Sequence, residues 1–299
     1  MGTFLSLTKR NIKMFFKDKG MFFTSLITPI ILLVLYVTFL AKVFKESFLS
    51  NIPSGVSVSP SLIDGMVAGE LVSSLLAVCC VPVAFCSNLL MVQDKVNGAR
   101  KDFCVSPLKK STLAFSYYFA SLITTLIITY SATALGLGYI AISGWYLSFA
   151  DVMLVLLDVF LLTMFGTALS SIVNSALKTN GQASAVGTIV SAGYGFICGA
   201  YMPISSFGSV LQNILGFLPG TYGTSLIRNH CLGGVFREMA KQGFSDTVIS
   251  GIKDSVDCNL YFFNNNVSLG TMAGILIGAI ALCIGIYVLI NFIKKEKAK

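Results

Sequence analysis

Charged residues are scarce in this chain. Asp, Glu, Lys and Arg make up 11% of its 299 residues, whereas hydrophobic residues make up 55%. A soluble domain usually has about a quarter of its residues charged, because it needs polar side chains to cover its surface in water. The shortage of charge therefore excludes a water-soluble globule and predicts an integral membrane protein.

Several catalytic and ligand-binding patterns are missing as well. His230 is the only histidine and no Cys-x-x-Cys pair occurs, so a metal site has no support. No GxxxxGK[ST] loop is present to cradle phosphates; the stretch 181–188, GQASAVGT, has the wrong glycine spacing and no lysine. HExxH and GxSxG are absent too. We expect no catalytic residue, no metal and no cofactor bound by this chain.

Most of the eight cysteines lie in apolar stretches, where cysteine packs as a small hydrophobe. Cys104 falls in a basic loop. Cys231 and Cys258 share one loop, and they would form a disulfide if that loop faces an oxidising compartment. The cysteines of the apolar stretches are Cys79, Cys80, Cys86, Cys198 and Cys283.

Six stretches are long and apolar enough to cross a bilayer, which takes about 20 residues of helix. Pro29 and Pro82 lie inside the first two and predict kinks there. The first stretch is not followed by a small-residue cleavage site, so we expect no cleaved leader. The predicted spans are residues 21–41, 65–92, 113–142, 152–173, 183–202 and 269–293.

The basic residues predict the orientation of these spans. The net charge is +8, but the lysines and arginines stand in short clusters beside apolar stretches rather than on one face, which argues against nucleic acid as a partner. Most of them lie before the first span, after the second and after the last. By the positive-inside rule, both termini of this multi-pass plasma-membrane protein are cytoplasmic.

Residues 1–20 predict an amphipathic helix at the inner membrane interface. At 100° per residue the apolar residues share one arc and the basic residues the opposite one. The lysines and Arg10 would then face anionic lipid headgroups. The apolar arc comprises Phe4, Leu5, Thr8, Ile12, Phe15 and Phe16, and the basic arc comprises Lys9, Arg10, Lys13 and Lys17.

The loop at 93–112 is too polar to enter the bilayer and too short to form a domain. Gly98 and the pair Ser106-Pro107 punctuate it and leave room for a short helix between them. Its mixed apolar and basic character suits docking into a groove of another protein. A basic loop that only sets topology would look similar, so the loop alone does not decide between the two.

Two segments together resemble the permeases of ATP-binding-cassette type 2 (ABC-2) transporters. The loop at 93–112 is similar to the coupling segment of that family, with Ala99 in place of the usual threonine. The stretch 199–228, which follows the fifth span, is similar to the family's exit from the membrane. The matching residues are Asp94, Gly98, Phe103, Ser106, Pro107 and Leu108 in the loop, and Gly199, Pro203, Pro219, Tyr222 and Arg228 in the exit.

The resemblance implies an all-α fold in which residues 1–299 form one transmembrane domain with six spans. It implies a separate ABC ATPase that supplies ATP and Mg, and a dimer with a second copy or a homologous permease. The cytoplasmic loop would dock on the ATPase through the six matched residues together with Arg100 and Lys101. The second and fifth spans would line the pathway, with Glu70, Gly187, Tyr194, Gly199, Pro203, Pro219 and Tyr222 along it or at its exit gate.

The same resemblance implies an extracellular loop at 203–268 with re-entrant helices. Residues 204–232 would form short helices that dip into the outer leaflet, and the polar stretch 233–267 would form a small exposed subdomain. GxxxG spacing at Gly195 and Gly199 permits close helix approach, either to a partner or within one subunit. Asp158, about two turns inside the fourth span, needs a hydroxyl or a cation in the bundle interior.

These features favour the permease subunit of an ATP-driven exporter with an amphipathic cargo, such as a drug, an antimicrobial peptide or a lipid-linked molecule. An ATP-independent secondary transporter or channel is the alternative; inverted repeats or several mid-membrane charges would favour it, and the sequence shows neither. A membrane enzyme lacks the catalytic residues it would need.

Overall fold

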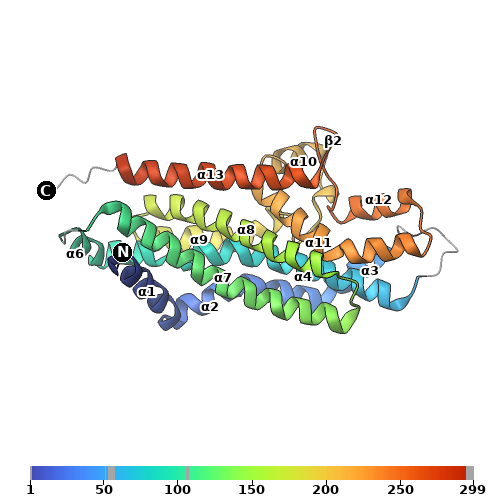
Figure 1. The fold of residues 1–299 in the computed structure, drawn as a ribbon, viewed down its shortest axis with the longest axis horizontal. Coiled ribbons are helices and arrows are strands. Elements are labelled where there is room, and N and C mark those ends of the chain that lie inside the picture. Colours follow the sequence, from blue (N-terminus) through green and yellow to red (C-terminus); the bar gives the residue numbers. More distant parts are fainter. Residues whose placement is uncertain (1, 51, 53–57, 106–107, 294–299) are drawn as a thin grey trace.

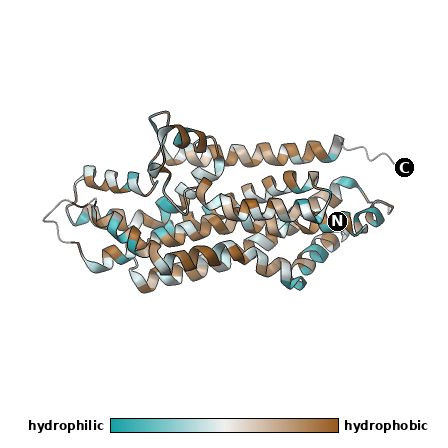
Figure 2. Ribbon diagram, turned by 180° about the vertical axis from the view of Figure 1, so that it is seen from behind, coloured by the Kyte–Doolittle hydropathy of each residue, from teal (hydrophilic) through white to brown (hydrophobic). Residues whose placement is uncertain are grey.

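A computed structural model describes residues 2–50, 52, 58–105 and 108–293. It shows an elongated bundle of long helices with a small hairpin beside one end (Figure 1). Hydrophobic residues dominate the long helices, and hydrophilic ones gather toward the ends of the bundle (Figure 2). The all-α architecture implied by the resemblance is confirmed, apart from that short hairpin.

Five helices among the described residues are long and apolar enough to cross a membrane. The first is continuous from α2 through a π-helical turn, η1, into α3, and the second is α4 followed by α5. Pro29 and Pro82 lie inside α2 and α4. The bounds are α2 Lys19–Leu35, η1 Tyr36–Leu40, α3 Ala41–Ser50, α4 Pro60–Ser87, α5 Leu90–Val96, α7 Lys110–Ser143, α8 Phe149–Ala176 and α13 Leu269–Ile293.

The predicted fifth span corresponds to α9, Asn180–Ile197. Its glycines, serines and amide side chains make α9 less hydrophobic than the five apolar helices, so the count of six spans stays a prediction. The predicted end at Met202 is wrong. Gly199 has a φ of +77°, and the N–H groups of Ala200 and Tyr201 both turn back to the carbonyl of Gly195. A left-handed glycine of this kind terminates a helix.

The region between α9 and α13 is more ordered than the sequence indicates. A short 3-10 helix, η2 (Ile204–Ser206), and α10 (Ser209–Leu215) lead into α11 (Pro219–Lys241) and α12 (Asp246–Ser255). An antiparallel hairpin of β1 (Leu260–Phe262) and β2 (Asn265–Val267) follows, with Leu260 opposite Val267. The boundary predicted between residues 232 and 233 is wrong, because α11 runs through it without a break.

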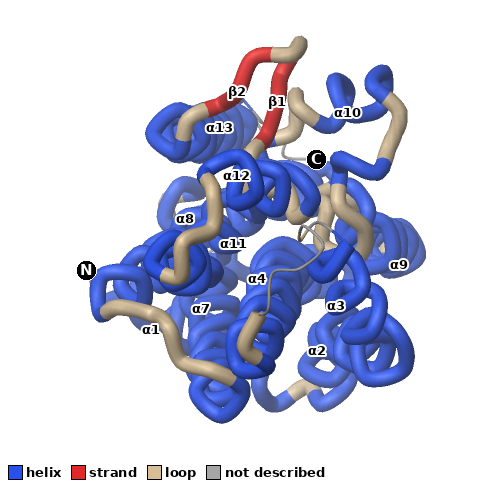
Figure 3. The backbone as a smooth tube through the Cα atoms, turned by 90° about the vertical axis from the view of Figure 1, so that its right-hand side faces the viewer, coloured by secondary structure: helices blue, strands red, loops and turns tan. Residues whose placement is uncertain are grey.

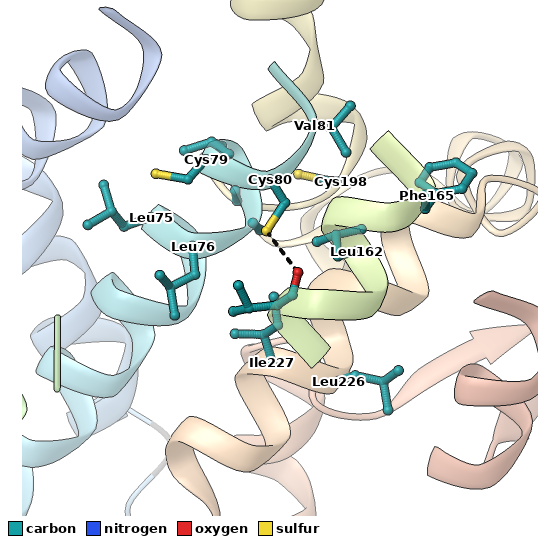
Figure 4. Packing of buried hydrophobic residues seen from close by; sticks show 14 of the residues in the cluster. Leu75, Leu76, Cys79, Cys80, Val81, Leu162, Phe165, Cys198, Leu226 and Ile227 are labelled. Atoms are coloured by element: carbon teal, nitrogen blue, oxygen red, sulfur yellow. Dashed lines mark hydrogen bonds between the residues drawn. The ribbon is translucent and has the colours of Figure 1, made fainter. Parts of the chain in front are cut away.

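Helix α4 forms the centre of the bundle. Every residue from 65 to 88 is buried, and α4 packs against α2, α7, α8, α9 and α11 (Figure 3). Its apolar residues point to every side and its few polar ones, such as Glu70 and Ser74, form no separate face, as expected of a helix enclosed on all sides. The thiol of Cys80 reaches the carbonyl of Val159 on α8 at 3.7 Å, amid leucines from α4, α8 and α11 (Figure 4).

The first helix, α1 (Gly2–Lys17), packs against α7. Its buried side is Leu7, Thr8, Asn11 and Phe15. The predicted apolar arc is thus divided, since Thr8 and Phe15 turn inward while Leu5 and Phe16 stay exposed. Helix α1 therefore covers the bundle with one side and leaves apolar residues on another.

Candidate functional site

Two short helices form the predicted coupling segment. Helix α5 ends at Val96, and α6 (Ala99–Val105) begins directly after Gly98. Gly98 has a φ of +81°, a conformation that glycine adopts at little cost and other residues rarely adopt. The short helix predicted between Gly98 and Ser106 is therefore present. Ser106 and Pro107 themselves lie outside the described residues.

Asp94 lies in the interior, contrary to its predicted role in docking on another protein. Both terminal nitrogens of Arg10 in α1 donate to its two carboxylate oxygens, one of them to Oδ1 at 3.0 Å. The hydroxyl of Tyr117 in α7 donates to Oδ2 at 2.6 Å. We call Arg10, Asp94 and Tyr117 the Arg10 cluster. It joins α1, α5 and α7, so Asp94 ties the predicted coupling segment to the bundle.

The prediction that Arg10 faces lipid headgroups is also wrong, because its guanidinium lies between Asp94 and the ring of Phe103. Its Cζ is 5.4 Å from the ring centroid, which is a cation–π distance. The hydrogen bond from Arg10 to Asp94 raises the pKa of Arg10 above its ordinary value, so the cation persists. The sequence places Arg10 and Asp94 84 residues apart, which hides the pair.

The remaining coupling residues divide between interior and surface. Phe103 and Leu108 are half-buried against a cluster of Leu7, Met91, Leu113 and Tyr117. Lys101 is exposed and Arg100 is half-buried. Val105 is 88% exposed at the end of α6. The surface that α6 presents therefore combines exposed Lys101 and Asp102 with one apolar residue at its tip, and it is smaller than the surface predicted.

A long groove runs between the first apolar helix and α9. It encloses about 1300 Å³. Asp18 is the only charged residue among the described residues that line it, and hydroxyl groups of both helices lie along the otherwise apolar walls. Gly187, predicted on the pathway, lines it. The hydroxyl residues are Thr24, Thr28, Ser184, Thr188 and Ser191.

The walls of this groove differ from the predicted pair of helices. The second span contributes Cys86, with Leu89 and Gln93 just beyond α4, whereas α2, η1 and α3 supply most of one wall. The reason is the burial of α4 at the centre of the bundle. Residues 201–203, 205 and 206 line the groove at the hairpin end, and Pro203 is among them.

A second buried group of charges lies near that end of the groove. Arg228 of α11 is 1% exposed, and its Nη2 is 3.0 Å from Oε1 of Glu70 on α4. The same nitrogen donates to the Gly199 carbonyl at 2.9 Å and to Ser74 Oγ at 3.1 Å. Its Nη1 is 3.5 Å from Oδ2 of Asp257. We call Glu70, Arg228 and Asp257 the Arg228 cluster.

Asp257 extends this cluster to the backbone after α9. Its carboxylate accepts the N–H groups of Ile204 at 2.5 Å and Ser205 at 3.0 Å. Burial raises the pKa of Asp257 above the usual value for aspartate, while Arg228 opposes that rise. From the sequence, Arg228 only matched the exit pattern of the family, and Asp257 was missed. The signal available was a lone arginine in an uncharged stretch, which needs a partner when buried.

The other predicted exit residues serve packing and helix starts. Pro219 occupies the first turn of α11, where its missing N–H costs nothing. The hydroxyl of Tyr222 donates to the Gly216 carbonyl at 2.5 Å. Tyr194 is buried beside Gly220, where a Cβ would lie 2.7 Å from its hydroxyl. Pro219, Tyr222 and Tyr194 are not among the described residues that line the groove.

The GxxxG pair packs within the subunit. A Cβ on Gly195 would lie 2.4 Å from the ring of Tyr201, and a Cβ on Gly199 would lie 3.0 Å from Asp257. Of the two alternatives for this spacing, packing inside one chain therefore holds.

Helices α8 and α11 are joined by two further side-chain pairs. Asp158 meets His230 Nδ1 at 2.5 Å, and Asp151 pairs with Arg237, seven residues away from the first pair on each helix. The expected polar partner for Asp158 is therefore the single histidine of the chain. No cluster of metal ligands occurs among the described residues.

Cys231 and Cys258 are free thiols, both buried. Cys231 packs in the main core and Cys258 in a separate cluster near α12, so the structure does not hold the disulfide considered from the sequence.

Comparison with known protein families agrees with this architecture. Residues 58–295 match the family model described as ABC-2 family transporter protein. The match covers most of the chain, including α4, the coupling segment and the helices from there to α13. No curated protein matches the sequence. A bundle of apolar helices with this family match identifies a membrane transport component, and the chain belongs to the ABC-2 family of transporter proteins.

Proposed function

We propose that this permease is the membrane-spanning subunit of an exporter that moves an amphipathic cargo outward across the plasma membrane. The groove between the first apolar helix and α9 carries this proposal. Its apolar walls suit the hydrocarbon part of a cargo, and its row of hydroxyl groups suits the polar part. Drugs, antimicrobial peptides and lipid-linked molecules all combine these two parts.

We infer the orientation of the subunit in the membrane from its basic residues. The basic residues around α1 and α6 favour a cytoplasmic position for that end of the bundle and for both termini. The hairpin end then faces outward. Exposed apolar residues on and after α10, namely Val210, Ile214 and Phe217, favour contact of this short helix with the outer leaflet.

A separate ABC ATPase would supply the energy, holding ATP and Mg itself. Helix α6 offers the contact, since Lys101 and Val105 are exposed there. Movement of α6 would reach α5 through the Gly98 turn, and the Arg10 cluster would pass it to α1 and α7. These contacts support a rigid lever rather than a flexible loop.

This chain encloses the groove only in part, so a second permease, identical or homologous, would complete its wall. Helix α9 and the first apolar helix would then face the partner. Membrane lipid covers the remaining apolar helices, such as α13, whose Leu282 and Leu289 are exposed.

Purification and reconstitution test this function. The tagged chain, extracted gently from its native host, should bring down a P-loop ATPase. In proteoliposomes, the complex should transport at least one of a set of amphipathic dyes, peptides and lipid-linked molecules only with ATP and Mg. Transport by the chain alone, without nucleotide, would instead establish the ATP-independent alternative.

A further inference from the structure

Arg228 ties three parts of the chain together at one point. Its Nη2 alone contacts Glu70 and Ser74 of central helix α4 and the carbonyl of Gly199 just after α9. Arg228 itself belongs to α11. An arginine that bridges separate segments in this way fixes their relative position, because its planar donor group accepts little change in geometry.

Asp257 completes the connection on the other side. It holds the N–H groups of Ile204 and Ser205, while Arg228 holds the Gly199 carbonyl. Three backbone groups within residues 199–205 are therefore bound by this one pair. Asp257 adopts a φ of +53°, a conformation uncommon for residues other than glycine, so its position has a conformational cost.

The segment held in this way lies at the hairpin end of the groove. Residues 201–203, 205 and 206 belong to its lining. Whether this end of the groove is narrow or wide therefore depends on where residues 199–206 rest. We call these residues the exit segment.

Stability alone does not explain the Arg228 cluster. Two acids surround one cation, and Glu70 Oε2 and Arg228 Nε have no hydrogen-bond partner among the described residues. Buried ion pairs of this kind often stabilise a fold no better than apolar residues of the same volume. Such incomplete pairing fits a set of contacts that Arg228 makes in one state of the transporter and gives up in another.

We propose that Arg228 is the positioning residue of the exit, and that it holds the exit segment closed on α4 until transport parts it from Asp257. This rests on the proposed function. In the closed state the exit segment covers the end of α9. When the Asp257 contact opens, the segment is free to move about Gly199, whose positive φ marks the turn.

Cys198 reports on this movement. It is 1% exposed and directly precedes Gly199. The experiment uses a chain whose other seven cysteines are replaced by alanine, purified in detergent with its ATPase. A membrane-impermeant maleimide is applied without nucleotide and after trapping with ADP and vanadate, and the labelling rate of Cys198 is measured in each state.

Labelling should be slow without nucleotide and about tenfold faster in the trapped state. A tenfold change is expected when the free-energy difference that favours the closed over the open exit segment falls by about 1.4 kcal/mol. Asp257→Asn weakens the hold on the two N–H groups and on Arg228, so labelling should be fast in both states. Asp151→Asn is the matched control. It breaks the pair with Arg237, which lies on the same helix as Arg228, but it does not touch the exit segment, and it should behave as the parent chain.

Slow, nucleotide-dependent labelling in Asp257→Asn would overturn the proposal, and so would an unreactive Cys198 in every state. If Asp257→Asn fails to fold, the labelling rate of Cys198 is compared between Glu70→Gln and the parent chain. Fast labelling of Glu70→Gln in both states supports the proposal, and slow, nucleotide-dependent labelling overturns it. Failure of the proposed function looks different: no ATPase co-purifies, yet Asp257→Asn in the chain alone still shows whether the exit segment is held as proposed.

Discussion

The two charged clusters at opposite ends of the bundle are built from similar groups but differ in enclosure. In the Arg10 cluster one arginine faces one carboxylate, and the Arg10 side chain is 31% exposed. In the Arg228 cluster one arginine faces two carboxylates, and all three side chains are almost fully buried. Water can replace part of the first set of contacts and almost none of the second.

This difference suits the position of each cluster. The Arg10 cluster joins a surface helix to the coupling segment, where partial exposure of Arg10 lets water offset part of the cost of a lost contact. The Arg228 cluster holds backbone groups in the interior, where a lost contact leaves an unpaired charge. A modest change of charge should therefore be tolerated at the first cluster and damaging at the second.

The largest effect is expected for Arg228→Leu. Removing the cation leaves Glu70 and Asp257 buried without a counter-charge, at a cost of about 3–5 kcal/mol in the free energy of unfolding. We expect the midpoint of thermal unfolding in detergent, measured by size-exclusion chromatography of heated samples, to fall strongly. A collapse in the yield of folded protein would be the more severe form of the same result.

Arg237→Leu is the control for that change. Arg237 lies on the same helix and also pairs with an aspartate, but its side chain is 52% exposed. Its loss should cost about 1 kcal/mol or less. Equal shifts in the two variants would show that burial does not distinguish these pairs.

Gly98→Pro should have the next largest effect, and it acts at the other end. Proline fixes φ near −65°, which is incompatible with the +81° of Gly98. The turn between α5 and α6 would be strained by about 1–3 kcal/mol. Transport driven by ATP should drop about tenfold or more, while insertion into the membrane remains normal.

Gly243 provides a matched position for this variant. It has a φ of +85°, and a Cβ added there would meet open space, as it would at Gly98. Gly243→Pro imposes similar strain just after α11, at the hairpin end, and also removes the hydrogen bond from the Gly243 N–H to the Ala240 carbonyl. It should lower stability at least as much and leave coupling to ATP hydrolysis unchanged. Unimpaired transport in Gly98→Pro would refute the docking role of the coupling segment.

Asp94→Asn should have a smaller effect, which sharpens the comparison between the clusters. The amide keeps the size of the carboxylate but weakens the bonds from Arg10, at a cost of about 1–2 kcal/mol. A double-mutant cycle with Arg10→Gln measures the interaction directly. We expect a coupling energy of about 1 kcal/mol, and a value near zero would show that the pair does not stabilise the coupling end.

The sequence predicted what depends on neighbouring residues. Apolar stretches indicated five of the long helices, and Gly98 with the polar residues around it indicated the short helix α6. Hydropathy also indicated α9, through the apolar stretch 183–202, but glycines and serines make this helix less apolar than the other five, so its role as a sixth span stays a prediction. Its end was missed because it depends on the φ of one residue, Gly199.

The partners of the charges could not be predicted in the same way. Asp94 meets Arg10 across 84 residues, and Glu70 meets Arg228 across an even longer separation. Only the packing of α1 on α7 and of α11 on α4 brings these groups together. The resemblance implied that Asp94 faces a partner protein. The fold turns it inward, because a carboxylate beside a buried tyrosine and an arginine is fully satisfied there.

The smallest effect on stability is expected for Val105→Ser, which tests the surface of α6 alone. Val105 is 88% exposed, so its loss should change the free energy of unfolding by less than about 0.5 kcal/mol. Ile142→Ser is the control, with equal exposure at the hairpin end of α7. Only Val105→Ser should reduce recovery of the ATPase with the tagged chain. If both variants retain the ATPase equally, then the partner does not contact the tip of α6, and the Arg10 cluster positions a segment that has another role.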